Sequence, residues 1–497
     1  MNAHSRRMVS PEPSECFLCR RVHSDNDIQM EQRPCHPLLN FIILSVLFSV
    51  NHGVIVSCLA FATLQFGATA AWQLVFFHLV YAASALLGAT YLVKQLGPRN
   101  SMILGMGLNS TYVGCFWMAM EWHAFMDFFA VVGAVLGGVG GGLVWTAQGA
   151  YFGRASQDYA VVANVKSDTA TSFLASMFAF IYLSGEVICK LLSWAILQSQ
   201  YSKWTTVFGV YTVVAVSSTS LLTSVHNYSC SQDDDNHSIG YKMTVAWQLL
   251  RHNQKIPYMI GLNAVFGFAY PFVNSYVNGE VVHRVLVHDT NLRYVGIFSA
   301  LSSAVAAICS VVFCRGGKAP VLMGGAVSFA AVALLFLIRP NLNDWGWEML
   351  SAVYILQGMG RATFEGALRA TYADFFPEEI EGAFANIILQ NGIFTALGFG
   401  LSFSVTCSHE GPYCVQYKEG GLHNVLVLEL AVVLSAVIAI LGYWKAASLN
   451  YQSEEMGSVF ENEEESQFII FDLERVIDTA PREHPGDQHD AASLNQR

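Results

Sequence analysis

The stretch TAQGAY, Thr146–Tyr151, returns in the second half of the chain as TFEGAL, Thr363–Leu368. Both copies contain the same Thr, Gly and Ala, and they place Gln148 opposite Glu365. Two further matches occur in the same order, LGPRNSMILG at 96–105 with GGKAPVLMG at 316–324, and Ala-Asn at 163–164 with Ala-Asn at 385–386. Because the separations are nearly constant, the sequence predicts two halves that are repeats of one unit.

The composition places these repeats in a membrane. The 497 residues are 53% hydrophobic and 13% charged, whereas soluble domains carry about a quarter charged residues. A helix needs about 20 apolar residues to cross a bilayer. Twelve segments reach that length: 37–62, 68–93, 100–120, 124–152, 168–190, 204–225, 257–281, 293–314, 319–339, 346–372, 382–406 and 422–445. We therefore expect an all-α membrane protein with twelve transmembrane helices.

The longest internal polar stretch divides the helices into two groups of six. The expected parts are a cytosolic polar tail (1–36), an amino-terminal six-helix bundle (37–225), a cytosolic central loop (226–256), a carboxy-terminal six-helix bundle (257–446) and an acidic cytosolic tail (447–497). Two parallel six-helix repeats build the major facilitator fold, in which binding sites lie between the halves. The sequence predicts this fold.

The distribution of charge predicts the orientation of the chain. Lys and Arg concentrate on the side of the amino-terminal tail, which places both termini in the cytosol. Lys190 is counted with the opposite, outer loops, and Asn227 and Asn236 in the cytosolic loop are expected to be unglycosylated. The net charge of −11 comes from the acidic tail, and without a basic face a nucleic-acid partner is not expected. Plasma membrane and endolysosomal membrane are not distinguished.

Polar residues inside apolar helices are candidates for a substrate cavity, since polar groups are costly in a bilayer. The first, fourth, seventh and tenth helices line the cavity of the predicted fold. The candidates on these helices are Asn51, His52, Gln148, Tyr151, Asn263, Tyr270 and Asn274. The alternative for each is a hydrogen bond between helices.

The tenth predicted helix carries three charged residues at helical spacing. Arg361 and Glu365 are four residues apart and are expected to pair, and Arg369 extends the same face. Glu365 lies about 30 Å along the helix from Trp345 and is expected in its cytosolic third. Either the pair is structural, or these residues form an inner gate at which Glu365 takes up a proton. The following run FFPEEIEG is expected to be a solvated turn.

The remaining signals are weaker. Cys16 and Cys19 form a CxxC pair with Cys35 and His36 downstream, and a zinc site needs four well-placed ligands. The alternative is a tail with incidental or lipidated cysteines, and no metal is expected. Cys407 and Cys414 share an outer loop, where a disulfide is plausible. Without a catalytic motif or a phosphate-binding loop, neither an enzyme nor a cofactor is expected.

The acidic tail holds one further pattern. Glu465, Ile469 and Ile470 have the spacing of a sorting signal that coat adaptors recognise. The alternative is a disordered acidic tail with a short apolar patch.

The run WTAQGAYF at 145–152 resembles the fourth-helix signature of the Unc-ninety-three-like branch of the major facilitator superfamily. LGPR at 96–99, after the second predicted helix, resembles the Leu-Gly-basic loop of the same branch. The specific resemblance covers about residues 55–155, and the turn LQFGATA is shorter than in that branch. Its family positions are Trp145, Thr146, Gln148, Gly149 and Tyr151. The resemblance implies a polytopic protein linked to ion-channel regulation or receptor trafficking.

Two functions follow from these observations. The first is transport of a small solute or ion by alternating access between the two halves. The second is a non-transporting regulator, with a membrane channel or receptor as its partner. In both cases the chain resides in a lipid bilayer.

Overall fold

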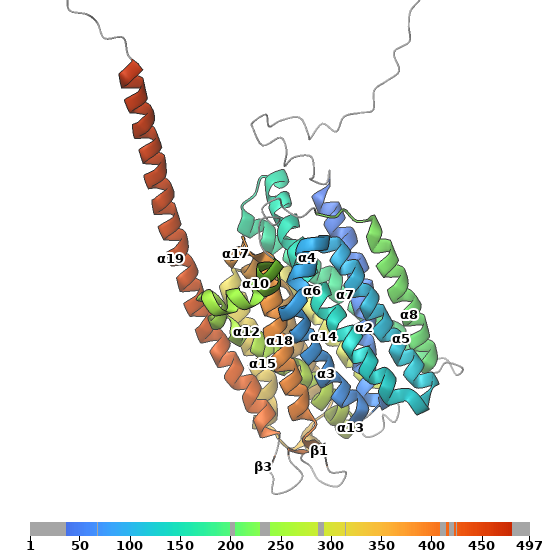
Figure 1. Ribbon diagram of the computed structural model, residues 1–497. Coiled ribbons are helices and arrows are strands. Elements are labelled where there is room, and N and C mark those ends of the chain that lie inside the picture. The colour runs from blue at the N-terminus through green and yellow to red at the C-terminus, as the bar shows by residue number, and fades with distance from the viewer. Residues whose placement is uncertain are drawn as a thin grey trace, which may run out of the picture.

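Long helices packed side by side make up almost the whole bundle (Figure 1). The structure, a computed structural model, describes residues 36–66, 68–198, 204–228, 239–286, 293–313, 315–407, 414–416, 422–423 and 425–479. Each of the twelve predicted segments is helical over most of its length, which confirms the all-helical prediction for the membrane region. Residues 405–406 and 422–423, at the edges of the last two segments, are strands instead.

The first half contains six long helical segments. They are α2 (Pro37–Phe66), α3 (Ala68–Ser84) continued by η1 (Ala85–Ala89) and α4 (Thr90–Leu96), α5 (Pro98–Glu121), α6 (Met126–Ala163) after η2 (His123–Phe125), α7 (Ser167–Gln198), and α8 (Trp204–Leu221) with η3 (Leu222–Ser224). The break between α4 and α5 lies at Gly97, whose φ of 77° favours glycine, and Pro98 then begins α5.

The second half repeats this plan after two short helices, α10 (Ile239–His252) and α11 (Lys255–Tyr258). Its long segments are α12 (Ile260–Pro271) with η4 (Phe272–Val281) and α13 (Val282–Val285), α14 (Arg293–Phe313), α15 (Lys318–Ile338) with η5 (Leu342–Asp344), α16 (Trp347–Thr363) with η6 (Phe364–Leu368) and α17 (Arg369–Phe375), α18 (Ile380–Ser402), and α19 (Leu426–Thr479). Segments η1, η4 and η6 are π-helical.

The helix pairings of the two halves correspond. In the first half α5 packs on α6 and α8, α3 on α6, and α2 on α7; in the second α15 packs on α16 and α19, α14 on α16, and α12 on α18. Between the halves the main contacts are α7 with α14 and α3 with α18, which are equivalent positions of the repeat. The duplicated sequence therefore folds into a duplicated arrangement of helices.

Ten helices of the described chain are long and apolar enough to cross a membrane. The α5 and α16–η6–α17 segments are not among them, because they carry more polar residues. Asn109 and Ser110 lie in the middle of α5, and the second segment holds Arg361, Glu365 and Arg369. Both lie within the bundle among the other helices, so twelve segments are arranged as membrane helices.

Three boundaries differ from the sequence predictions. Helix α7 continues to Gln198, so Lys190 is buried in the bundle and not in an outer loop. The central loop contains α10, whose Val245 and Ala246 are buried while Trp247 is half exposed. Helix α19 runs without a break through the expected start of the tail at 447.

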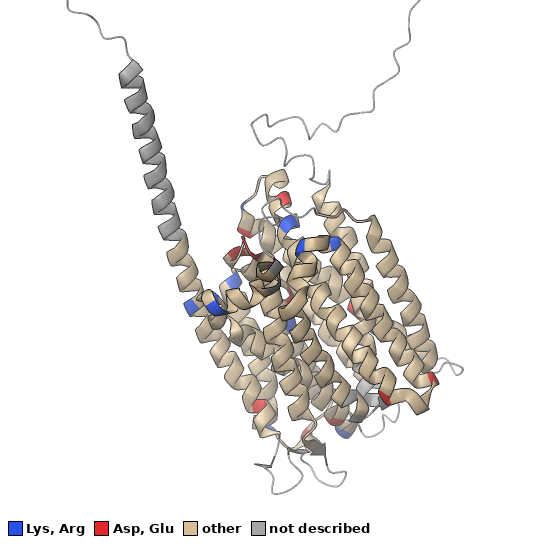
Figure 2. Cartoon of the chain, in the orientation of Figure 1, with Lys and Arg blue, Asp and Glu red and all other residues tan. Residues whose placement is uncertain are grey.

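Helix α10 lies across the boundary between the halves. It contacts η1 and α4 of the first half and α18 of the second. The Asn386 side-chain amide of α18 donates to the Ala246 carbonyl of α10 at 2.8 Å. We call the end of the bundle formed by α4, α10 and α17, uppermost in Figure 1, the α10 end. Figure 2 shows Lys and Arg gathered there, while the body of the bundle has few charges.

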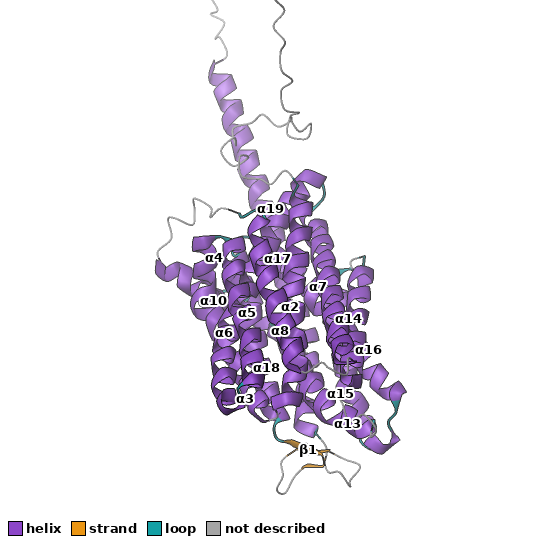
Figure 3. Cartoon of the chain, turned by 90° about the vertical axis from the view of Figure 1, so that its right-hand side faces the viewer, coloured by secondary structure: helices purple, strands orange, loops and turns teal. Residues whose placement is uncertain are grey.

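The opposite end carries a small sheet that the all-α prediction did not include. Strands β1 (Val405–Cys407), β2 (Cys414–Gln416) and β3 (Leu422–His423) are antiparallel in the order β1-β2-β3 (Figure 3). The backbone register places Cys407 opposite Cys414. Residues directly opposite in such a ladder have Cα atoms about 4.5–5.5 Å apart, within the range that a disulfide spans. The disulfide stays a prediction.

Several predictions concern residues with little or no described structure. Cys16, Cys19 and Asn236 lie outside the described residues. The backbone at Glu465, Ile469 and Ile470 belongs to α19, but their side chains are not among those described. Asn227 is described, and its side chain accepts from the Arg99 amide at 3.1 Å and donates to the Leu96 carbonyl at 3.3 Å.

Candidate functional site

A cavity lies between the halves, with walls mainly from α2, α3 and α6 of the first half and from α12, α16–α17 and α18 of the second; α5 and α7 contribute one residue each, Asn109 and Tyr182. It contains about 750 Å³ of space free of protein atoms, its opening included. Its charged lining residues are Arg361, Glu365 and Arg369. His52 and Tyr270, both predicted cavity residues, also line it, as does Trp145.

Arg369 is held by residues from both halves. Its Nη1 donates to the Gln148 side-chain oxygen at 3.0 Å, and its Nη2 pairs with a Glu365 carboxylate oxygen at 3.2 Å. The guanidinium carbon lies 4.2 Å from the centre of the Trp145 ring, a cation–π arrangement. Gln148 and Glu365, which the repeat places at equivalent positions, therefore bind the same arginine.

The expected Arg361–Glu365 pair is wrong. Arg361 binds Glu186 of α7 in two places, Nη1 to Oε1 at 2.9 Å and Nη2 to Oε2 at 2.6 Å, and Nη2 also donates to the Tyr182 hydroxyl at 3.0 Å. The π-helical segment η6 begins between Arg361 and Glu365 and changes the angular spacing of the side chains. Glu365 consequently pairs with Arg369, and Arg361 pairs across the two halves.

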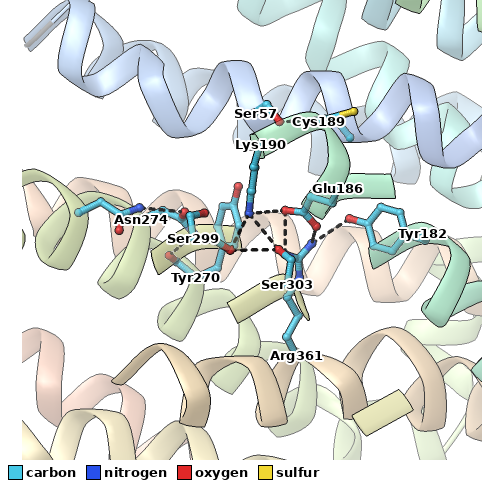
Figure 4. A network of polar contacts seen from close by, with 12 residues as sticks. Ser57, Tyr182, Glu186, Cys189, Lys190, Tyr270, Asn274, Ser299, Ser303 and Arg361 are labelled. Carbon is cyan, nitrogen blue, oxygen red and sulfur yellow. Dashed lines mark hydrogen bonds and ion pairs between the residues drawn. The ribbon is translucent and has the colours of Figure 1, made fainter. Parts of the chain in front are cut away.

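Lys190 completes this second network (Figure 4). Its ammonium nitrogen lies 2.7 Å from Glu186 Oε1, 3.0 Å from the Ser303 hydroxyl and 3.3 Å from the Ser299 carbonyl. Three acceptors match the three N–H donors of a charged lysine. Glu186 is therefore shared by two cations, one from its own helix and one from the other half.

A smaller cavity lies beside these residues. Glu186, Lys190 and Arg361 line it together with Asn274, a predicted cavity residue, and with Tyr270. Asn274 donates to the Tyr270 carbonyl at 3.0 Å. Because Tyr270 and Arg361 line both cavities, the two ionic networks belong to one site.

Two predicted cavity residues instead connect helices. The Asn51 amide donates to the Ser110 hydroxyl at 3.3 Å and to the Ala215 carbonyl at 3.1 Å, which joins α2 to α5 and α8. The Asn263 amide donates to the Tyr372 hydroxyl at 2.9 Å and to Gln390 at 2.7 Å. Neither asparagine lines either cavity described above, because its helix turns that face toward its own half.

One residue of the TAQGAY motif contacts a cavity residue, and the others contribute to helix packing. Gln148 does not line the cavity but reaches it through Arg369. Thr146 donates to the Gly142 carbonyl within its own helix. Tyr151 is fully buried and packs on Tyr228 with ring centres 4.9 Å apart, so it is not a cavity residue.

Gly149 allows α6 to approach α18 closely. A Cβ atom at this position would lie 2.1 Å from the ring of Phe384.

The α10 end is closed by ion pairs between the halves. Lys94 pairs with Glu379 at 3.4 Å, and Arg154 pairs with Glu381 at 3.0 Å. The Thr171 hydroxyl donates to Asp374 at 2.8 Å. The FFPEEIEG run is thus not a solvated turn, because two of its carboxylates connect the halves.

Several buried polar atoms at the cavity lack a partner within the described part of the chain. They are His52 Nδ1, Asn109 Oδ1, Asn391 Nδ2, Thr395 Oγ1 and the Nε atoms of Arg361 and Arg369. Asn391 is 8% exposed and Thr395 is 1% exposed. Since buried polar groups are nearly always hydrogen-bonded, these atoms are available to a bound solute or to water.

Sequence reasoning missed part of this site for identifiable reasons. Glu186 and Lys190 are spaced i, i+4 in an apolar run, but the prediction from sequence counts Lys190 with the outer loops and does not consider Glu186. Asn391 and Thr395 lie on the eleventh segment, α18, where nothing in the sequence indicates which face meets the other half.

Comparison with known proteins agrees with this architecture. The chain has a TM-score of 0.57 to the fucose:proton symporter FucP of E. coli, at 11% sequence identity, over 83% of this chain and 98% of that one. It has a TM-score of 0.55 to the xylose transporter XylE of E. coli, at 16% identity, over 82% and 96%. The chain has the major facilitator fold.

Among curated proteins, the chain is similar to Protein unc-93 homolog A. It is 27% identical to the Mus musculus protein over 201 residues, which are 39% of this chain and 40% of the relative, and 27% identical to the Xenopus laevis protein over 173 residues, 34% of each. The chain thus matches less than half the length of these relatives. No family model matches.

These relatives confirm the resemblance to the unc-93 proteins within the major facilitator fold. The matched proteins are transporters or unc-93 homologues by name, and none of those cited is named as an enzyme. The chain is a multi-pass membrane protein of transporter fold.

Proposed function

We propose that this chain is a secondary transporter that moves a small solute or ion by alternating access between its two halves. The observation that supports this most directly is Arg369, which lines the cavity and is bonded to Gln148 of one half and Glu365 of the other. A solute that competes for this arginine changes a contact between the halves.

The ion pairs suggest how such a cycle proceeds. Lys94–Glu379 and Arg154–Glu381 hold the halves together at the α10 end, which the charge distribution predicts to be cytosolic. Opening that end requires both pairs to break. Arg361–Glu186, nearer the cavity, also joins the halves. In this proposal, solute binding at Arg369 shifts the balance between these contacts, and the halves rock about the site.

The test is transport by the purified full chain in liposomes. Glu365→Gln removes the charge that holds Arg369 within its own half, so we expect altered flux with normal membrane insertion. Glu348→Gln is the matched control, since Glu348 lies exposed at the start of the same segment. Unchanged uptake and efflux of every solute tested, in a variant of normal abundance, would count against this proposal.

A non-transporting regulator is the second candidate function. It is favoured by the similarity to unc-93 homolog A and by α19, which extends well beyond the bundle (Figure 1). This candidate predicts a stoichiometric channel or receptor partner in the membrane. A cross-linking pull-down from native membranes should recover that partner, and recovery of none argues against regulation.

A further inference from the structure

The two joined cavities contain an unbalanced charge. Lys190, Arg361 and Arg369 are 3%, 7% and 4% exposed, and they face two carboxylates, Glu186 at 0% and Glu365 at 4%. These five are the charged residues that line the two cavities. Three cations against two carboxylates leave one positive charge without a counterion among the described residues. Isolated buried charges are very costly.

No other buried carboxylate of the described chain supplies the balance. Glu381 is paired with Arg154 at the α10 end, and Glu429 lies on α19 and lines neither cavity. Lys190 has three oxygen atoms within hydrogen-bond distance of its nitrogen, including a Glu186 carboxylate oxygen at 2.7 Å, which matches the three donors of an ammonium group. The excess of positive charge therefore stands.

The free polar atoms at the cavity are mainly donors. The Nε atoms of Arg361 and Arg369 and the Nδ2 of Asn391 have no partner in the described part, and neither has the Thr395 hydroxyl. All four residues line the larger cavity. Asn109 Oδ1 is an unpartnered acceptor at the same cavity, and His52 Nδ1 can act either way. The donors outnumber the acceptors, which favours a ligand that carries oxygen acceptors and negative charge.

The remaining wall is mostly apolar, and aromatic side chains form much of it. Tyr81, Trp145, Phe266, Tyr270 and Phe364 line the same cavity. Phe266 and Phe364 stack with ring centres 3.7 Å apart. Such a wall fits an apolar body better than a fully hydrated inorganic ion.

We propose that the cavity binds a monovalent organic anion, with its carboxylate or similar group at Arg369 and Arg361 and its apolar body against the aromatic wall. This assignment deepens the proposed transport function and rests on it for its biological meaning. The binding event itself does not require transport.

The excess of one positive charge in the two joined cavities can be tested without knowledge of the natural ligand. Asn391→Asp places a carboxylate of the same shape in the cavity and is expected to raise the Tm of the full chain in neutral-lipid nanodiscs. Gln390→Glu is the matched control, because Gln390 is also buried on α18 but lines neither cavity, and it should lower Tm. In a Lys190→Met background the two remaining cations are already balanced by two carboxylates, so Asn391→Asp should lower Tm there, as Gln390→Glu does in the unchanged chain. Equal losses for Asn391→Asp and Gln390→Glu in the otherwise unchanged chain would overturn the proposal.

Ligand binding to the unchanged chain provides a second test that needs no variant. Sodium benzoate should raise Tm with concentration, at ionic strength matched with sodium chloride, and benzamide of the same shape should bind about ten- to a hundred-fold more weakly. Asn391→Asp should abolish the benzoate effect. Benzoate that binds no better than benzamide would overturn the assignment.

The lipid composition distinguishes the two sources of such an anion. If the ligand is an acidic lipid, phosphatidylglycerol in the nanodisc should raise Tm and remove the response to benzoate; if it is a soluble carboxylate, the response should persist. If benzoate binds but no solute is transported, only the transport proposal is contradicted. If a solute is transported without a preference for anions, only the proposal of an organic-anion site is contradicted.

Discussion

The two copies of the repeated motif differ in what surrounds them. In the first, on α6, Gly149 lies against Phe384, with no room for a Cβ, and the helix is regular. In the second, Gly366 lies in the π-helical segment η6, and the nearest atom to a Cβ there is 4.0 Å away. The first copy is packed tightly against the other half, whereas the second has space around it.

The charges follow the same division. Arg361 and Arg369 of the second copy correspond to Val144 and Phe152 of the first, by the spacing that aligns Gln148 with Glu365. Duplication alone would give symmetric residues, so the arginines mark where the halves have specialised. The first copy packs tightly against the other half, and the segment around the second copy supplies the charged residues of the larger cavity, Arg361, Glu365 and Arg369.

The largest effect is expected from the acid that balances Arg361. Glu186→Gln leaves both Arg361 and Lys190 without a carboxylate, which should cost about 3–5 kcal/mol of stability. Thermal unfolding of the purified chain measures this. Glu429→Gln is the control, since Glu429 is buried on α19 and forms no ion pair in the described part. Similar losses of stability in both variants would show that the ion pair between Glu186 and Arg361, next to the second copy, is no more important than an unpaired buried carboxylate.

Exchanging the polar residues of the two copies should cost less. Glu365→Gln alone weakens the hold on Arg369 by about 1.5–3 kcal/mol. Adding Gln148→Glu returns a carboxylate to the same guanidinium from the other half, so the double variant should recover most of the lost Tm. Additive losses would mean that Gln148 and Glu365 do not act on one group.

The packing difference predicts unequal effects of one substitution. Gly149→Ala forces Phe384 or α6 to move and should cost about 1–3 kcal/mol. Gly366→Ala should change stability by no more than about 0.5 kcal/mol, as there is space for its methyl group. Measured unfolding free energies for the pair decide the point, and equal values would remove the contrast between the copies.

The smallest effect concerns Tyr151, whose counterpart in the second copy is Leu368. The Tyr151 hydroxyl has no hydrogen-bond partner in the described part of the chain. Tyr151→Phe keeps the ring contact with Tyr228 and should alter stability by less than about 0.5 kcal/mol. A large loss of Tm or of flux would instead reveal a role for the hydroxyl.

The fold was largely predictable because crossing a bilayer imposes long apolar runs, and these are visible in the sequence. The repeat also predicted that Gln148 and Glu365 occupy equivalent positions, and both side chains bind Arg369. Partners on other helices were not predictable: Arg361 selects Glu186 because of where α7 lies, which no local spacing reveals. Asn51 and Asn263 were misassigned because a helix face becomes interior or cavity only when its neighbours are placed.

The position of α10 limits how the molecule can open. Its packing against α18 is tight, since a Cβ at Gly382 would lie 2.4 Å from Val245 and 2.6 Å from Leu249. Its main contacts with the first half, among the described residues, are with η1 and α4. If the chain opens at the α10 end as in the proposed transport cycle, this linker should move with the second half and separate from the first. Amide hydrogen exchange measured during transport should then increase most on the surface of α4 that α10 uncovers.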